Sequence, residues 1–359
     1  MTGFVSRALQ SLAAAGLLFA ASLQPGHAQP LPALGADLAR TSVSGLSSGA
    51  YMAGQFQVAY SDIVTGAGIV AGGPYGCAQV PGSESNPNWP AVLTWNVNRA
   101  LTQCMQDTGW FWFFSSIPSA SGLVSRASAL AQAGKIAPLE GLAAGKIYLF
   151  WGGNDGTVVR GVVETAEKFY RKAGVPQGNI AFVTHGKAAH AFVTDDGGLT
   201  CGTAGAPFIN DCDYDQAKAI LTQMYGELQP AGAAVDANYL TFDQWPFAAG
   251  FVGPGFAKDG AAYAPADCRA RPGCAVHVVF HGCQQGRKTA GDAVVKGAGY
   301  ARWAEANRII VLFPQVEPAA LNPRGCWDWW GYTGPHFLER QAPQMLTVRR
   351  MLDRLAAAP

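Results

Sequence analysis

The chain has 359 residues, of which 49% are hydrophobic, and it carries a formal net charge of +1. This length is enough for one large hydrophobic core or two smaller ones. Charged residues make up only 14% of the chain, so it lacks the basic surface of a nucleic-acid-binding protein and we expect no nucleic-acid partner. The low charge is typical of an exported protein that works on an apolar surface.

Residues 1–28 have the pattern of a signal peptide. Arg7 supplies a positive charge, an apolar stretch covers residues 8–23, and small residues precede a cleavage position after Ala28. A membrane anchor is the alternative, but the apolar stretch is short and is followed by Pro25. We therefore expect cleavage, no stable membrane insertion, and a mature protein that is secreted, either extracellular or periplasmic.

Residues 45–49 read Gly-Leu-Ser-Ser-Gly, which is the pattern Gly-x-Ser-x-Gly. Residues 39–43 suit a short strand and residues 50–60 suit a helix, so Ser47 lies on a predicted strand-to-helix turn. Such a turn presents the serine hydroxyl above a sheet, beside the positive end of the helix. In a glycine-rich chain the pattern also arises as a plain turn, so the interpretation depends on partners further along.

Two later strands are followed by candidate partners. The buried strand 146–151 leads to Asp155, and the strand 179–184 leads to His185 and His190. Catalytic groups of open α/β sheets lie at the carboxyl ends of the strands, which makes Asp155 the candidate acid, although an Asp before Gly is also a common turn residue. We prefer His190 to His185 as the base because its loop of small residues gives it greater reach.

A further strand, 276–280, ends in a His-Gly turn. Such a turn resembles the oxyanion turn of lipases and esterases, although His281 can instead be a buried structural histidine. Ser47, Asp155 and His190 follow the α/β-hydrolase order, but the oxyanion strand, which comes before the nucleophile in the common α/β-hydrolase chain, here comes last. If the C-terminal helix would lead into the nucleophile strand, the fold is a circularly permuted α/β hydrolase, with a mostly parallel sheet flanked by helices.

The other elements follow from periodicity and turn residues. A long helical excursion over the sheet is predicted for residues 74–136, and its aromatic run, 110–114, is expected to pack in the core. Irregular structure is expected at residues 195–208 and 232–260. The remaining strands are predicted at 63–72 and 309–314, and the remaining helices at 159–173, 214–226, 290–307 and 342–356.

Eight cysteines fit an oxidising compartment. The sequence does not fix their pairing, and the simplest arrangement joins neighbours along the chain: Cys77–Cys104, Cys201–Cys212, Cys268–Cys274 and Cys283–Cys326. Zinc binding is the rival interpretation. No Cys-x-x-Cys or paired-histidine spacing is present, so we expect no metal.

Seven blocks, all in one order, together resemble the short-chain-length poly(3-hydroxyalkanoate) depolymerases, which include the poly(3-hydroxybutyrate) depolymerases. The likeness is to the type in which the lipase box precedes the oxyanion segment. The blocks extend from about Ser44 to Gly334 and cover most of the mature chain. They read SGLSSGAYMA, AGIVAGGPYGCA, GGNDGTV, HAFVT, VVFHGCQQ, RIIVLFPQ and NPRGCWDWWGYTG.

The resemblance implies one circularly permuted α/β-hydrolase domain over residues 29–359 that cleaves ester bonds of poly(3-hydroxybutyrate) or related polyesters. No cofactor or metal is expected. The roles it implies are nucleophile for Ser47, acid for Asp155, base for His190, and oxyanion hole for the backbone N–H groups of Ser48 and Cys283.

The resemblance also suggests that a tryptophan among Trp327, Trp329 and Trp330 lines the substrate crevice, although three core tryptophans are the alternative. We include His281 among the candidate substrate contacts. No linker or separate polymer-binding domain is expected, so adsorption would use apolar side chains of the catalytic domain, which we expect to be a monomer. The alternatives are a 3-hydroxybutyrate-oligomer hydrolase, a short-chain or feruloyl-type carboxylesterase, or a polymer-binding protein on a degenerate hydrolase fold.

Overall fold

The computed structural model describes residues 29–108 and 116–359. The predicted signal peptide, 1–28, and the aromatic run, 110–114, lie outside the described residues. Within the described part of the chain, no helix combines the length and the apolar character needed to cross a bilayer.

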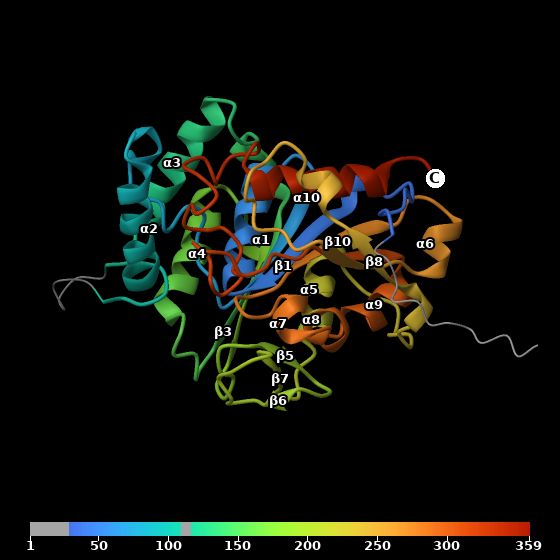
Figure 1. Ribbon diagram of the computed structural model, residues 1–359. Helices are drawn as coiled ribbons and strands as arrows, with labels where there is room; N and C mark the ends of the chain where they lie inside the picture. The colour runs from blue at the N-terminus through green and yellow to red at the C-terminus, as the bar shows by residue number, and fades with distance from the viewer. Residues whose placement is uncertain (1–28, 109–115) are drawn as a thin grey trace, which may run out of the picture.

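An eight-stranded, mostly parallel sheet forms the centre of the molecule (Figure 1). The strands follow the order β4-β3-β2-β1-β10-β11-β9-β8, with β9 and β8 antiparallel at one side. The central strands are almost continuously buried, as parallel strands covered by helices on both faces must be. The strands are β1 (Thr41–Leu46), β2 (Val64–Val70), β3 (Lys146–Gly152), β4 (Ile180–His185), β8 (Tyr239–Asp243), β9 (Asp259–Tyr263), β10 (Ala275–Phe280) and β11 (Ile309–Phe313).

Helices cover the two faces of this sheet and bury two apolar cores (Figure 1). One face carries α1 (Ser48–Ala59), α4 (Arg160–Lys172) and α10 (Pro343–Ala356). The other carries α5 (Gln216–Tyr225), α8 (Ala293–Gly297) and α9 (Tyr300–Asn307). The predicted helical excursion is confirmed as α2 (Trp89–Gln103) and α3 (Ala120–Gln132), and α3 packs against α4.

The end of α10 lies directly against the segment that enters β1. The backbone N–H groups of Leu34 and Ala36 donate to the carbonyl of Leu355 at 3.1 and 3.0 Å, and Gly35 donates to Ala357 at 2.9 Å. In the sheet, β1 pairs in parallel with β10, which comes more than 200 residues later in the chain. The last helix is thus placed to lead into the nucleophile strand, which confirms the circularly permuted α/β-hydrolase fold.

The helix predicted for residues 290–307 is wrong as a single element. The chain forms three short helices instead: α7 (Arg287–Ala290), α8 and α9. Gly291 and Gly299 separate them with φ angles of 59° and 81°, a left-handed conformation that ends a right-handed helix.

The two segments expected to be irregular contain strands. Residues 232–260 include β8, and residues 195–208 include β6 (Leu199–Thr200). With β5 (Phe192–Thr194) and β7 (Ile209–Asp211), β6 forms a separate small sheet in the order β5-β7-β6. These strands are too short for a period-2 pattern to identify them.

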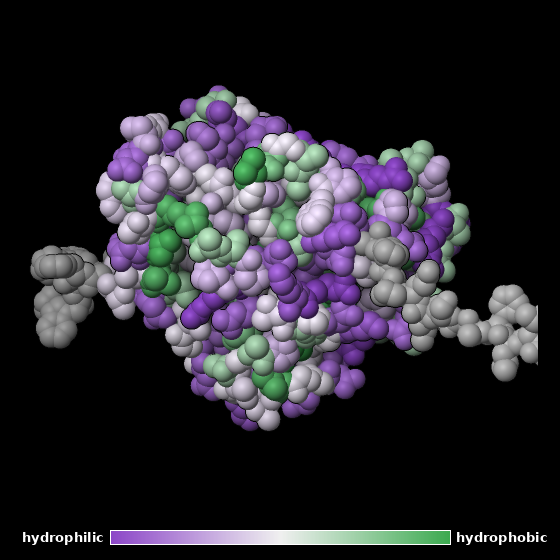
Figure 2. All heavy atoms as spheres, in the orientation of Figure 1, coloured by the Kyte–Doolittle hydropathy of each residue, from purple (hydrophilic) through white to green (hydrophobic). Residues whose placement is uncertain are grey.

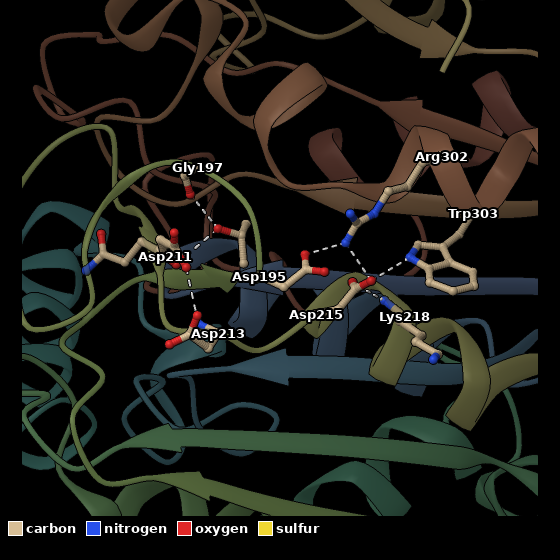
Figure 3. A network of polar contacts seen from close by, with 10 residues as sticks. Asp195, Gly197, Asp211, Asp213, Asp215, Lys218, Arg302 and Trp303 are labelled. Atoms are coloured by element: carbon tan, nitrogen blue, oxygen red, sulfur yellow. Dashed lines mark hydrogen bonds and ion pairs between the residues drawn. The ribbon is translucent and has the colours of Figure 1, made fainter. Parts of the chain in front are cut away.

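A polar network holds the small sheet to α5 and α9 (Figure 3). Arg302 on α9 pairs with Asp195, just after β5, and donates to Asp215 Oδ2 at 2.6 Å. The Trp303 indole N–H donates to the same oxygen at 2.8 Å, and Asp215 Oδ1 caps α5 by accepting the Lys218 N–H at 2.9 Å. This network fixes the chain that immediately follows the predicted catalytic loop.

The four disulfides join neighbouring cysteines and confirm the simplest pairing: Cys77–Cys104, Cys201–Cys212, Cys268–Cys274 and Cys283–Cys326. The last of them joins the turn after β10 to the tryptophan-rich segment.

A buried polar chain connects β1 to its neighbours. His277 on β10 lies 2.7 Å from the hydroxyls of both Ser42 and Ser44 on β1, one at each ring nitrogen. These serines in turn lie 2.7 Å from the hydroxyls of Tyr225 and Tyr300 on the helices below. Burial lowers the pKa of His277 to about 3, so the ring is neutral in the folded protein.

We expect His277 to weaken the fold in acid. Between about pH 6.5 and 3 the unfolded chain takes up a proton that the folded ring excludes, so the free energy of unfolding falls as the pH falls. His277→Gln cannot titrate. Between about pH 7 and 4.5 it should lose about 2 kcal/mol less stability in urea unfolding than the wild type does. Equal losses in the two proteins would contradict this assignment.

Candidate active site

Ser47 occupies a strained turn between β1 and α1. Its backbone has φ 56° and ψ −119°, a conformation that residues other than glycine rarely adopt. The turn is fixed by hydrogen bonds at both ends: the Ser47 N–H donates to Val70 at 2.9 Å, and its carbonyl accepts the Tyr51 N–H at 3.0 Å. The predicted strand–turn–helix context is confirmed, and it has the geometry of a nucleophile elbow.

Both glycines of the pentapeptide allow the turn to lie against the end of β10. A Cβ on Gly49 would be 2.1 Å from the carbonyl oxygen of Phe280 and 2.5 Å from that of His281. A Cβ on Gly45 would be 2.6 Å from the Phe280 oxygen and 2.4 Å from Gly49 itself. Only glycine fits at either position. The two glycines of the Gly-x-Ser-x-Gly pattern are therefore explained by a close backbone contact between the end of β1 and the end of β10.

Asp155 and His190 form a buried hydrogen-bonded pair. His190 Nδ1 lies 2.9 Å from Asp155 Oδ2, and the other carboxylate oxygen accepts the backbone N–H groups of Thr157 and Val158 at 2.8 and 2.9 Å. The carboxylate is therefore oriented by the turn that precedes α4. With Nδ1–H donating to Asp155, the lone pair of His190 is on Nε2, the tautomer that a general base requires.

The loop that carries His190 is fastened to the loop that carries Asp155. Gly153 donates to the His185 carbonyl and Asn154 to that of Ala188, both at 2.9 Å. His185, the rival candidate base, lies apart from Asp155, and its Nδ1 is 3.8 Å from Cys201 Sγ. The structure brings the acid together with His190 rather than with His185.

Tyr51 lies on the helix that follows the serine turn, and its hydroxyl donates to the Cys104 carbonyl. It lies one helical turn beyond Ser47, and burial and then the charge of Asp155 raise its pKa. Its ring stacks on Trp329 with centroids 4.0 Å apart and planes 8° from parallel. The strands β1, β3, β4 and β10 are parallel, so their carboxyl ends lie at one edge of the sheet. The turn that carries Ser47 and the loops that carry Asp155 and His190 therefore lie at the same edge.

Ser47 lines an apolar cavity of about 410 Å³. The cavity lies between α2, the turn after β10 and the segment after β11. Figure 2 shows apolar side chains gathered over the α2 side of the molecule. The cavity is lined by Ser47, Val97, Ala100, Leu101, Met105, Cys283, Leu321, Asn322, Pro323, Arg324, Cys326, Trp329 and Trp330.

The two predicted oxyanion donors lie on turns that meet at this cavity. Ser48 is the first residue of α1, so its N–H has no partner within the helix. Cys283 lines the cavity, and its N–H donates to no other described group. One of these N–H groups follows Ser47 directly in the chain and the other belongs to the cavity that Ser47 lines, a pairing that is able to stabilise a developing oxyanion.

The three predicted tryptophans have different positions. Trp329 and Trp330 line the cavity, whereas Trp327 is fully buried against Phe280, with ring centroids 4.9 Å apart. His281 is also buried: its Nδ1 donates to the Gly282 carbonyl at 2.7 Å, and its Nε2 accepts the Val316 N–H at 3.2 Å. Both ring nitrogens are thus occupied within the protein, and burial lowers the pKa of His281 to about 4.

A buried carboxylate shapes the tryptophan loop. Asp328 Oδ1 accepts the N–H groups of Gly331 and Tyr332 at 2.6 and 3.0 Å, and Oδ2 accepts the N–H and hydroxyl of Thr333 at 2.9 and 2.6 Å. The Asp328 N–H donates to Gln344 on α10 at 2.8 Å. This residue therefore holds the backbone on which Trp329 and Trp330 are mounted.

One group of described residues has a spacing that could suit a metal: His185, Cys201 and Cys212. The two cysteines form a disulfide with each other, so they offer no thiolate. This group does not fit a structural or catalytic zinc ion.

Sequence reasoning missed the apolar wall opposite the serine, made by Val97 and Leu101 on α2 and by Leu321. These side chains are 36%, 54% and 61% exposed. The only available signal was the four-residue spacing of Val97 and Leu101, which places both on one helix face. This spacing does not predict which part of the fold that face of α2 contacts.

We expect Gly49→Ala to lower hydrolysis of a chromogenic short-chain ester by at least about a hundredfold, because the added Cβ pushes Ser48 away from β10 and so disrupts an oxyanion donor. Gly54→Ala, in the same helix, is the control: its Cβ would have no neighbour closer than 3.5 Å. It should keep full activity and gain about 0.5–1 kcal/mol of stability. Similar activity in the two variants would contradict the role of the close contact.

Asp328→Asn should loosen the tryptophan loop, because an amide cannot accept all four hydrogen bonds. We expect a higher KM, greater quenching of tryptophan fluorescence by acrylamide, and a stability loss of about 1–3 kcal/mol. The exposed Asp353→Asn is the control and should change none of these. An unchanged KM and quenching in Asp328→Asn would show that the carboxylate does not position the loop.

The known proteins that this chain resembles are poly(3-hydroxybutyrate) depolymerases. No family model matches the chain. It is 40% identical over 332 residues to a poly(3-hydroxybutyrate) depolymerase of Delftia acidovorans, with 91% of this chain aligned, and it spans only 62% of that relative's length. It is 31% identical over 342 residues to a polyhydroxybutyrate depolymerase of Talaromyces funiculosus, which aligns with 89% of this chain over 91% of its own length.

Two solved structures share the fold at 30% sequence identity, each covering 91% of this chain and 99% of the other. One is a substituted PHB depolymerase in complex with an R3HB trimer, with a TM-score of 0.77. The other is the PHB depolymerase of Penicillium funiculosum, with a TM-score of 0.75. On sequence and structure together, the chain belongs to the poly(3-hydroxybutyrate) depolymerase family.

Proposed function

We propose that the protein is a serine esterase that hydrolyses poly(3-hydroxybutyrate) and its oligomers through an acyl-enzyme. The observation that carries the proposal is the buried Asp155–His190 pair at the same sheet edge as Ser47, which opens into an apolar cavity. The complex of a related depolymerase with an R3HB trimer supports this substrate class.

In the proposed mechanism, His190 Nε2 takes the proton of the Ser47 hydroxyl as its oxygen attacks the ester carbonyl. Asp155 holds the ring in the required tautomer and stabilises the imidazolium. The same proton then passes to the alkoxide that leaves. Water, activated by His190, hydrolyses the acyl-serine and releases the 3-hydroxy acid.

The tetrahedral oxyanion is stabilised by the N–H groups of Ser48 and Cys283 in this proposal. Each donor belongs to a rigid turn, so neither has to reorganise as charge develops. The elbow strain at Ser47 serves the same purpose, because it points the hydroxyl into the cavity.

The cavity suits a polyester because its walls are mainly aliphatic and aromatic. Trp329 and Trp330 meet edge to face, with centroids 5.8 Å apart at 88°, and form one corner. Leu101 and Leu321 are exposed at the other side. A 3-hydroxybutyryl unit is uncharged and carries a methyl branch, so it can bury apolar surface here without leaving a charge unpaired.

We propose that residues 29–359 form one catalytic domain, active as a monomer and secreted after removal of residues 1–28. Four disulfides support an oxidising compartment.

The test is clearing of an amorphous poly(3-hydroxybutyrate) suspension by the mature protein. Ser47→Ala and His190→Ala should each lower the rate at least about a thousandfold, because the two residues act as one unit. His185→Ala is the matched control and should stay within about twofold of the wild type, since it lies outside the pair. Full activity in Ser47→Ala, or an equal loss in His185→Ala, would refute the assignment.

A further inference from the structure

One charged residue, Arg324, is among those that line the otherwise uncharged candidate cavity. Among the described residues around it, Arg324 alone carries a charge, since Cys283 and Cys326 are joined in a disulfide. The proposed substrate is a neutral polyester, which gives no reason for a cation in the cavity that Ser47 lines. The charge therefore points to something other than an internal unit of the polymer.

The guanidinium of Arg324 is free of partners in the described structure. The residue is exposed, and its side chain forms no hydrogen bond or ion pair with any described residue. Several other arginines are used within the fold: Arg287 pairs with Asp292, and Arg340 pairs with Asp62. Arg324 thus keeps all its N–H donors available for a ligand.

The backbone of Arg324 is nevertheless fixed beside the proposed oxyanion hole. Its carbonyl accepts the N–H of Gln284 at 2.7 Å, and Gln284 follows Cys283 directly. The residues on either side of Arg324 are also joined to each other. The Cys326 N–H donates to Asn322 Oδ1 at 2.8 Å, and Asn322 Nδ2 donates to the Cys326 carbonyl at 2.7 Å. With the disulfide, these bonds anchor the arginine to the same turn that offers the oxyanion donor.

The chemistry of the substrate supplies a partner. A polyester of 3-hydroxy acids is neutral along its length, and only the acid end of each chain carries a carboxylate. A guanidinium presents parallel N–H groups that match a carboxylate with two hydrogen bonds. Every cleavage also produces a new carboxylate in this cavity.

Resting on the proposed function, we propose that Arg324 binds the terminal carboxylate of a hydroxyacyl chain. The site then prefers short oligomers and chain ends with a free acid over the same chains with a blocked end. The residue sets specificity and takes no part in bond cleavage. The alternative is that its aliphatic stem simply extends the apolar wall next to Leu321.

The test compares the (R)-3-hydroxybutyrate trimer as the free acid with its methyl ester, at low ionic strength and neutral pH. Arg324→Met keeps an aliphatic stem and removes the charge. We expect it to lower kcat/KM for the acid about tenfold, equivalent to about 1.4 kcal/mol, mainly through KM. The methyl ester should change less than about twofold. Arg324→Lys should keep part of the preference, because it retains a charge without the planar fork.

Arg171→Met is the matched control, since it removes the same charge from an exposed position on α4 outside the cavity. It should leave both rates unchanged. If Arg324→Met lowers both rates equally, or neither, the carboxylate role is overturned while the proposed esterase activity stands. If the wild type cleaves neither trimer, the proposed function fails and this inference fails with it.

Discussion

The close contact between the β1–α1 turn and the end of β10 determines the rest of the site. Gly45 and Gly49 have no room for a side chain, because the carbonyl oxygen of Phe280 occupies the space where each Cβ would lie. This contact fixes the elbow that holds Ser47 relative to the turn that holds Cys283. Catalysis by preorganised donors requires that relative position to be set before substrate arrives. The strain at Ser47 persists because the surrounding backbone is held on both sides.

A second group of constraints extends from the same turn. The Cys283–Cys326 disulfide and the Gln284–Arg324 hydrogen bond attach the segment after β11 to the β10 turn. Asp328 then orders the loop that follows, with its carboxylate fully used by backbone and hydroxyl donors. The turn that carries the predicted oxyanion donor and the loop that carries the cavity tryptophans are thus joined into one rigid unit.

Much of this could be predicted from sequence where a local pattern reflects a local cause. The apolar runs of β2, β3, β10 and β11 identify buried parallel strands, and β1 is identified by the Gly-x-Ser-x-Gly turn that follows it. The cysteine pairing was only the simplest of several arrangements, because two of the disulfides close loops of 27 and 43 residues. The single helix predicted for residues 290–307 failed because apolar periodicity continues through Gly291 and Gly299, whose left-handed φ angles interrupt it. The burial of Trp327 and His281 could be given only as an alternative. It depends on Phe280 for Trp327 and on Val316 for His281, and each of these partners is distant in sequence from the residue that it contacts.

The permuted order of the chain shows which features the active site needs. The strands before residues 47, 155, 190 and 283 end at one edge of the sheet, and this adjacency does not depend on where the chain begins. The strand before the predicted oxyanion turn, β10, can follow β1, β3 and β4 in the chain because the end of α10 lies against the segment before β1, as the bonds from Leu34 and Ala36 show. The cavity, in contrast, is built from α2 and the segment after β11, which lie outside the sheet. In the proposed function, the sheet therefore positions the catalytic groups, and the segments beside it decide which ester reaches the serine.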